Sequence, residues 1–271
     1  MVVGYLQGSQ FRKYVADWIV AIVLVIYFFL VAERAKPFER QFLITDLSIS
    51  HPFAIKERVS AIECLLISSL LPLSVISLVS IIKSRISRLS KQEFIHNLQI
   101  AILGLVISLS INGVVTDVLK NWVANLRPDF LARCGPRPGT KTNVLVGLEV
   151  CTAPLGMPVL IDGLRSTPSG HSSISFAGLL YLSYWLFGQF KLTQTRQPVW
   201  KPLVCGLPVL MATYIALSRT QDYRHHFADI IFGSILGIAF ATFSYFRYFN
   251  NFASEDMDKP VDQNPITILP L

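Results

Sequence analysis

Residues 95–128 read IHNLQIAILGLVISLSINGVVTDVLKNWVANLRP, and this stretch combines two features that recur along the chain. Its first part, Ile95–Val118, is almost wholly apolar and long enough to cross a bilayer, since a transmembrane helix needs about 20 largely apolar residues. Its second part places Lys120, Arg127 and Pro128 directly after the apolar segment. The stretch therefore predicts a membrane-spanning helix that ends in a polar, cationic site.

Further apolar segments of comparable character lie on both sides of this stretch, at Val15–Ala32, Ile62–Ile82, Ser173–Phe190, Pro202–Leu217 and Ile230–Phe249. Hydrophobic residues make up 52% of the 271 residues and charged residues only 15%, whereas a soluble domain has about 25% charged residues. We therefore expect an all-α, polytopic membrane protein with six transmembrane helices. Residues 1–249 would form this domain, and the proline-containing, acidic residues 250–271 would form a disordered cytoplasmic tail.

Basic residues predict the orientation of the spans. They gather in two short connections, with Lys83, Arg85, Arg88 and Lys91 after the second segment and Lys191, Arg196 and Lys201 after the fourth. Short basic connections stay in the cytoplasm, so we expect both termini to be cytoplasmic and the third and fifth connections to be luminal or extracellular. Because the net charge of +7 is explained in this way, we expect no nucleic-acid partner.

Three polar clusters fall on the predicted non-cytoplasmic side. They are Lys120–Pro128, Pro168–His171, and Ser218–Arg219 with His225, His226 and Asp229. Each cluster alone has an ordinary explanation, because cations beside a span often anchor it at the interface and Pro-Ser-Gly-His is a common turn before a helix. Their joint occurrence on one side favours a shared site.

The residue types in these clusters suit a phosphate group. Lys120, Arg127 and Arg219 are cations that can converge on one anion, and arginine offers a planar fork that matches phosphate oxygens. Ser169 and the backbone N–H of Gly170 add neutral donors near a helix start, where anions are favoured. The sequence therefore predicts a phosphate-binding site formed by these residues together with Ser218.

Two histidines, His171 and His225, can divide the roles of nucleophile and proton donor near neutral pH. Asp229 lies four residues after His225, which on a helix places both side chains on one face. A carboxylate in that position can hold an imidazole in one tautomer and stabilise its cation.

At these residues the chain resembles the type 2 phosphatidic acid phosphatases, also called lipid phosphate phosphatases. Their signature is K-x6-R-P, then P-S-G-H, then S-R-x5-H-x3-D, and every fixed position is filled here. The resemblance implies a helical phosphatase core of the vanadium-haloperoxidase-like type. It also implies that His225 is the nucleophile, that His171 is the general acid and base, and that Asp229 orients His225.

The resemblance implies a hydrolase that releases phosphate from phosphatidate, lysophosphatidate and diacylglycerol pyrophosphate through a phosphohistidine. The stretch from Ser218 to Asp229 is similar to the fungal members that act on diacylglycerol pyrophosphate, which favours the vacuolar membrane over the Golgi or endoplasmic reticulum. Three alternatives stay open: a sphingoid base phosphate phosphatase, a lipid phosphotransferase, and a non-catalytic lipid-binding membrane protein. Loss of a signature residue would mark the last, and none is lost.

No compact carboxylate cluster suited to magnesium is visible in the sequence, so we expect no cofactor and activity without divalent metal. Membrane phospholipids are the expected partners, and the oligomeric state is not predicted. Of the four cysteines, Cys64 and Cys205 fall inside predicted spans, whereas Cys134 and Cys151 both fall in the third connection. A disulfide between these two is expected if that connection faces an oxidising compartment.

Overall fold

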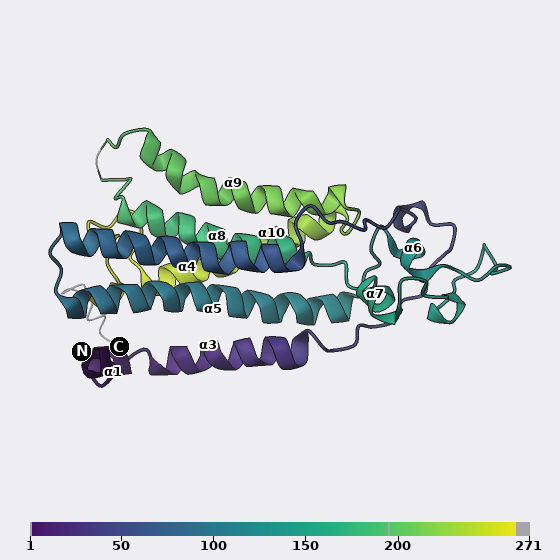
Figure 1. Ribbon diagram of the computed structural model, residues 1–271, viewed down its shortest axis with the longest axis horizontal. Coiled ribbons are helices and arrows are strands. Elements are labelled where there is room, and N and C mark those ends of the chain that lie inside the picture. The colour runs from purple at the N-terminus through teal and green to yellow at the C-terminus, as the bar shows by residue number, and fades with distance from the viewer. Residues whose placement is uncertain (1, 195, 264–271) are drawn as a thin grey trace.

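Figure 1 shows the computed structural model, in which residues 2–194 and 196–263 are described. Six long helices among these residues lie side by side along the long axis (Figure 1): α3 (Val15–Tyr27), α4 (Ala61–Ile86), α5 (Lys91–Val123), α8 (Gly170–Gln189), α9 (Trp200–Gln221) and α10 (Phe227–Tyr248). Short helices α1 (Val2–Leu6) and α2 (Ser9–Arg12) precede the bundle, and a π-helical turn, η1 (Phe28–Ala32), continues α3. The described residues form no extended strand, only isolated bridges such as Phe42 with Val146.

Helix α8 lies at the centre of the bundle, in contact with α4, α5, α9 and α10. Its backbone lies close to that of α10, where a Cβ atom at Gly233 or Gly237 would collide with the carbonyl oxygen of Ser169 or Ser173. These glycines have the small-xxx-small spacing that allows close helix contact. They hold the start of α10 against the start of α8, the two places where the histidines of the motifs lie.

Five helical segments among the described residues are long and apolar enough to cross a membrane: Val15–Ala32, α4, α5, α9 and α10. The sequence predicts a sixth span at Ser173–Phe190, which corresponds to α8, but α8 is not among these five. The difference follows from its position, because a helix enclosed by protein carries buried polar residues such as Ser172, Ser173 and Ser183. Polar residues in membrane bundles face the interior in this way. The number of six spans stays a prediction.

Helices α4 and α5 are longer than the apolar segments that predicted them. Each begins at a serine whose side chain accepts a hydrogen bond from the backbone of a glutamate three residues later, Ser60 with Glu63 and Ser90 with Glu93. Such capping boxes satisfy the free N–H groups of a first helical turn. The helices therefore extend to polar caps outside the apolar segment.

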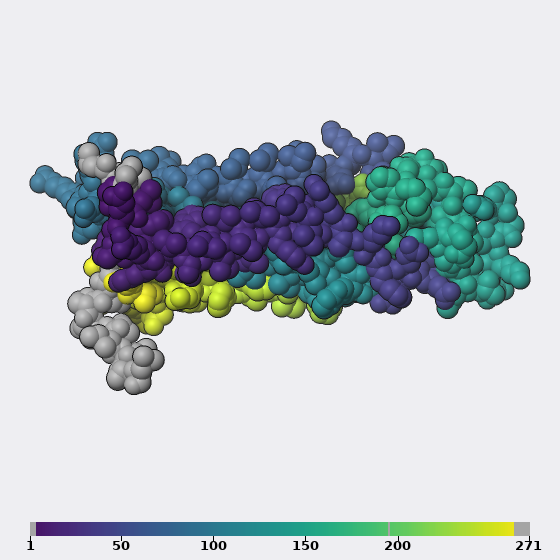
Figure 2. All heavy atoms as spheres, turned by 90° about the horizontal axis from the view of Figure 1, so that it is seen from below, coloured from purple at the N-terminus to yellow at the C-terminus, as the bar shows by residue number. Residues whose placement is uncertain are grey.

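The connections that precede α4 and α8 fold together into a cap at one end of the bundle (Figures 1 and 2). The cap contains η2 (Leu47–Ile49), α6 (Phe130–Cys134), η3 (Leu148–Val150) and α7 (Met157–Asp162). A small core that includes Phe42, Phe130 and Leu160 stabilises it. Cys134 and Cys151 are joined by a disulfide with a Cα–Cα distance of 4.6 Å, which ties α6 to the segment after η3.

The opposite end of the bundle carries α1 and the described part of the C-terminal segment. The carboxylate of Asp258 pairs with Lys83 at 2.6 Å and with Lys191 at 3.1 Å, and Asp262, in η4 (Val261–Gln263), lies 3.1 Å from His96. The sequence assigns residues 250–271 to a disordered tail, whereas residues 250–263 lie against the bundle. Phe252 packs against Phe187, and Met257 is fully buried, in addition to these carboxylate contacts. The rest of the predicted tail lies outside the described residues.

Candidate active site

A pocket of about 350 Å³ lies where the cap meets the bundle, and it brings together most of the side chains of the predicted site. Lys120 comes from the end of α5, Arg127 from the turn after it, Gly170 and His171 from the start of α8, Arg219 from the end of α9, and His225 from the turn before α10. All six line the pocket. Segments separated by more than a hundred residues therefore converge on one space.

His225 is held in one tautomer by a backbone carbonyl. Its Nδ1 lies 2.7 Å from the carbonyl oxygen of Ser166, and a carbonyl can only accept, so Nδ1 carries the proton and Nε2 keeps a free lone pair. Burial, followed by the charges of Arg127 and Lys120, holds the pKa of His225 well below its usual range. The imidazole is therefore neutral at neutral pH and suited to attack as a nucleophile.

Asp229 acts on His225 less directly than the sequence predicts. Its Oδ2 lies 4.0 Å from His225 Nδ1 and instead accepts hydrogen bonds from the hydroxyl of Ser166 at 2.6 Å and the backbone N–H of His226 at 2.9 Å. The hydroxyl of Thr167 donates to the other oxygen. Asp229 therefore fixes the segment whose Ser166 carbonyl holds His225.

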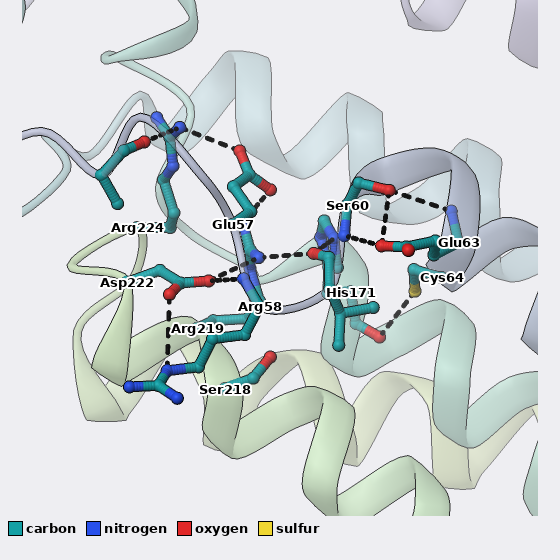
Figure 3. A network of polar contacts seen from close by, with 12 residues as sticks. Glu57, Arg58, Ser60, Glu63, Cys64, His171, Ser218, Arg219, Asp222 and Arg224 are labelled. Atoms are coloured by element: carbon teal, nitrogen blue, oxygen red, sulfur yellow. Dashed lines mark hydrogen bonds and ion pairs between the residues drawn. The ribbon is translucent and has the colours of Figure 1, made fainter.

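His171 lies in the first turn of α8, against the segment that leads into α4 (Figure 3). Its Nε2 is 3.2 Å from the carbonyl oxygen of Val59, and the same oxygen accepts a hydrogen bond from Arg219 Nη1 at 2.8 Å. One backbone carbonyl thus fixes both a histidine and a cation of the motifs. The sequence motifs contain no signal for this contact, because it involves the backbone of a residue outside them.

Lys120, near the end of α5, is buried against the start of α8. A Cβ atom at Gly170 would lie only 3.3 Å from Lys120 Nζ, so the glycine leaves room for the ammonium group beside the first turn of the helix. Among the described residues, no carboxylate lies within ion-pair distance of Lys120. A free cation and the N–H groups of a helix start together form a binding site for an anion.

The two arginines of the motifs, by contrast, are tied to carboxylates. Arg127 Nη2 donates to Asp162 at 2.7 Å and its Nε to the Asp162 carbonyl at 2.9 Å. Arg219 pairs with Glu57 at 2.9 Å and with Asp222 at 3.3 Å (Figure 3 shows the Asp222 contact). Burial lowers the pKa of Arg127 to about 10, which still leaves the guanidinium charged at neutral pH.

These pairs belong to one chain of alternating charges that crosses the cap. From one motif arginine to the other it runs Arg127, Asp162, Arg133, Asp129, Arg224, Glu57 and Arg219, with each neighbour in ion-pair contact. The Arg224 guanidinium also lies 4.2 Å from the ring centroid of Phe53. A connected network of this kind fixes the arginines at both of its ends.

Two serines of the predicted phosphate site lie behind the pocket rather than in it. Ser169 is fully buried and its hydroxyl accepts from the Ser172 N–H as the N-cap of α8. The Ser218 hydroxyl donates to the Ile215 carbonyl at 2.7 Å. Neither side chain lines the pocket, so the structure gives both a supporting position.

Four carboxylates that the sequence analysis did not assign also line the pocket: Glu33, Glu57, Asp117 and Asp162. The available signal is Asp117, a carboxylate inside the predicted span Ile95–Val118, where charged residues are costly and mark functional sites. Nothing local shows which acidic residues turn into a shared pocket, so the motifs alone do not predict these four.

Comparison with known proteins agrees with the motifs. Residues 101–253 match the PAP2 superfamily. The chain is 44% identical to diacylglycerol pyrophosphate phosphatase 1 of Saccharomyces cerevisiae, over 85% of this chain and 76% of the relative. It is 37% identical to a probable diacylglycerol pyrophosphate phosphatase 1 of Schizosaccharomyces pombe (86% and 81%), and 34% identical to lipid phosphate phosphatase 2 of Arabidopsis thaliana (88% and 78%).

No solved structure matches the chain. The family match nevertheless covers more than half of its length and spans all three motifs. The chain belongs to the PAP2 superfamily.

Proposed function

We propose that this protein is an integral membrane phosphatase that hydrolyses phosphatidate, lysophosphatidate and diacylglycerol pyrophosphate through a phosphohistidine at His225. The observation that carries the proposal is the pocket, in which a neutral His225 lies beside Lys120, Arg127 and Arg219. The names of the yeast and plant relatives support lipid phosphates as the substrate class.

In the first step, the lone pair on His225 Nε2 attacks phosphorus and the bond from phosphorus to the leaving oxygen breaks. His171 donates a proton to that oxygen. Because Nε2 of His171 donates to the Val59 carbonyl, the proton comes from Nδ1, and His171 must be the imidazolium when it acts. Burial and the charges of Arg219 and Lys120 lower the pKa of His171 to about 3, so this step requires the negative charge of the bound phosphate, which favours the imidazolium, to offset them. The three cations stabilise charge on the phosphoryl oxygens, and positioning with charge stabilisation supplies most of the catalysis in phosphoryl transfer.

In the second step, water attacks phosphorus and His171, now unprotonated, accepts a proton from it. The bond between phosphorus and Nε2 breaks, and phosphate leaves. The Ser166 carbonyl keeps His225 in the same tautomer throughout the cycle, since Nδ1 remains its donor.

An apolar wall supports a lipid as the substrate. From the cationic end, the pocket continues between Phe28 and Phe29 of η1 and Leu65 of α4. An adjacent apolar cavity of about 150 Å³ shares these side chains and extends toward Val106 and Leu109. A phosphate bound at Lys120 would therefore have room for an acyl chain beside it.

Independence from metals is part of the proposal. Positive charge comes from the side chains of Lys120, Arg127 and Arg219. Two of the pocket carboxylates, Asp162 and Glu57, are already engaged by arginines, so they are poorly suited to hold a magnesium ion, which needs free oxygen ligands.

In the proposed topology, both termini are cytoplasmic and the pocket lies on the luminal or extracellular face. The basic connections around Lys83 and Lys191 lie at the bundle end opposite the cap, together with α1. The disulfide lies in the cap, and disulfides persist in oxidising compartments. The resemblance to fungal members favours the vacuolar membrane.

The decisive experiment measures phosphate release from these three lipids by purified protein in a metal chelator. The wild type is expected to release phosphate, and His225→Ala is expected to lose activity by about 10⁴-fold or more. A matched substitution of the neighbouring histidine, His226→Ala, is expected to retain far more activity because its ring contacts Asp229 and not the pocket. Equal activity of wild type and His225→Ala would refute the mechanism, and loss of activity in chelator would refute metal independence.

A further inference from the structure

One face of α5 carries a graded series of side chains along the pocket. Lys120, Asp117 and Gly113 all line it, and at three to four residues apart they lie on the same side of the helix. Since α5 rises about 1.5 Å per residue, Asp117 is about 4.5 Å and Gly113 about 10 Å along the axis from Lys120. The face therefore passes from a cation through a carboxylate to a surface without a side chain.

The wall opposite α5 carries its side chains in the same order, with an apolar ring facing Gly113 and a carboxylate facing Asp117. Phe28 of η1 packs over Gly113, where a Cβ atom would lie 3.0 Å from its ring, and Glu33 follows at the end of η1, facing Asp117. Arg165 holds this end in place by donating to the carbonyl oxygens of Ala32 and Glu33, each at 3.2 Å. Two independent elements thus place carboxylates between the cationic end and the apolar end of the pocket.

Asp117 differs from the other buried carboxylates of the site. Its side chain is buried, with the residue 6% exposed, and its Oδ2 atom has no hydrogen-bond partner among the described residues. A buried acceptor without a partner costs about 1–3 kcal/mol. Because this oxygen lies in a pocket, a hydrogen-bond donor on a bound ligand can supply the missing partner.

We propose that Asp117 and Glu33 form a subsite that binds a hydrogen-bond donor of the substrate, a hydroxyl or an ammonium group on the carbon next to the one that carries the phosphate ester. The order of groups along such a lipid is phosphate, donor, hydrocarbon. It matches the order Lys120, Asp117, Gly113 along α5. The inference rests on the proposed function, because it assumes that the lipid phosphate binds at Lys120.

Two substrate classes present this donor and one lacks it. Lysophosphatidate with a free hydroxyl at the central carbon offers a neutral donor, and a sphingoid base phosphate offers a charged one. Phosphatidate has an ester at the same carbon and no donor. The subsite therefore predicts different responses to mutation for three lipids that share the same phosphate chemistry.

The test compares kcat/KM for the three lipids, in mixed micelles of one composition, between wild type, Asp117→Asn, Glu33→Gln and the control Glu39→Gln. Glu39 is an exposed glutamate of the same connection that does not line the pocket. In Asp117→Asn, we expect about a 30-fold loss on the sphingoid base phosphate, since a hydrogen bond to a charged group is lost, and about a fivefold loss on lysophosphatidate, where the amide oxygen still accepts. Phosphatidate should change by less than about twofold.

Glu33→Gln is expected to show the same ranking with smaller losses, because Glu33 lies at the exposed rim of the pocket. The proposal is overturned if both variants lower kcat/KM for the three lipids by the same factor, or if neither changes any of them. Retained phosphatidate hydrolysis reports that each variant is folded. A wild type that released phosphate from none of the three lipids would instead refute the proposed function.

Discussion

Two walls of the same pocket differ in whether their charged side chains form ion pairs. On one wall, Arg127 and Arg219 are the two ends of a continuous series of ion pairs through the cap. On the other, Lys120 and Asp117 lie one helical turn apart on α5, and neither makes an ion pair with any of the described residues. We call these the paired wall and the unpaired wall.

The difference indicates that the two walls have different roles in stability and in substrate binding. A buried charge that has its partners is held in one geometry, and preorganised charge is what stabilises a transition state. A buried charge without a partner costs free energy until a ligand supplies one. The paired wall is therefore expected to matter for both folding and catalysis, and the unpaired wall mainly for substrate binding and turnover.

The largest expected effect comes from breaking the paired wall at Asp129. Its carboxylate is fully buried between Arg133 at 2.8 Å and Arg224 at 3.3 Å. Asp129→Asn should lower the free energy of unfolding by about 3–5 kcal/mol, because it removes a fully buried charge that two guanidinium groups share and leaves Arg133 only Asp162 and Arg224 only Glu57 as counter-charges. Thermal unfolding in detergent measures this. Asp117→Asn on the unpaired wall is the matched control and should cost less than about 1 kcal/mol; equal losses would contradict the distinction between the walls.

The next effect concerns the cation of the unpaired wall. Lys120→Met should lower kcat/KM on phosphatidate by about 10²–10³-fold, the usual result of removing one preorganised donor to a transition state. The unfolding midpoint should equal or slightly exceed that of the wild type, since no ion pair is broken and a buried charge without a partner is removed. Lys141→Met, at an exposed position in the cap, is the control for a general loss of positive charge. A large fall in stability of Lys120→Met would show that Lys120 has a structural role.

A smaller effect is expected at Glu57, which joins Arg219 to Arg224. Glu57→Gln should lower kcat/KM by about tenfold, because Arg219 keeps Asp222 and the Val59 carbonyl as partners and loses only part of its support. Steady-state assays on phosphatidate measure this change. Activity unchanged within twofold would mean that the far end of the series does not position Arg219.

The smallest expected effect is on pH dependence. Partial burial, and then the neighbouring carboxylate of Asp117, raise the pKa of Glu33 to about 7, against the lowering effect of Arg165 and Lys120. Glu33 is therefore protonated below about pH 7 and ionised above it. Because an ionised carboxylate binds a donor more strongly, the preference for lysophosphatidate over phosphatidate should rise about threefold from pH 6 to pH 8. In Glu33→Gln, the ratio of kcat/KM for lysophosphatidate to that for phosphatidate should not change with pH. A wild-type ratio that falls as the pH rises would contradict the assignment.

Much of the bundle could be predicted from apolar length. The segment Pro202–Leu217 corresponds to α9 (Trp200–Gln221) and Ile230–Phe249 to α10 (Phe227–Tyr248). The ends differ because the helices continue to caps and turns that apolar length does not reveal. The gathering of Lys120, His171 and His225 into one pocket also agrees with the predicted shared side of the three motifs.

The supporting contacts could not be predicted, for two physical reasons. The hydrogen bonds from His225 to the Ser166 carbonyl and from His171 to the Val59 carbonyl involve backbone atoms, which leave no trace in residue type. The pairs of Arg219 with Glu57 and of Arg224 with Asp129 join segments far apart in the chain. Nothing local distinguishes these acids from any other acid near a span.

The most direct test of the central claim is to trap the covalent intermediate. Wild-type protein is mixed with a lipid whose terminal phosphate is radiolabelled, denatured in alkali within the first turnover, and digested. We expect the label on the peptide that contains His225, stable in alkali and released by acid, and none on the same peptide from His225→Ala. Label in the His225→Ala protein at the wild-type level, or label on a residue other than His225, would contradict the account.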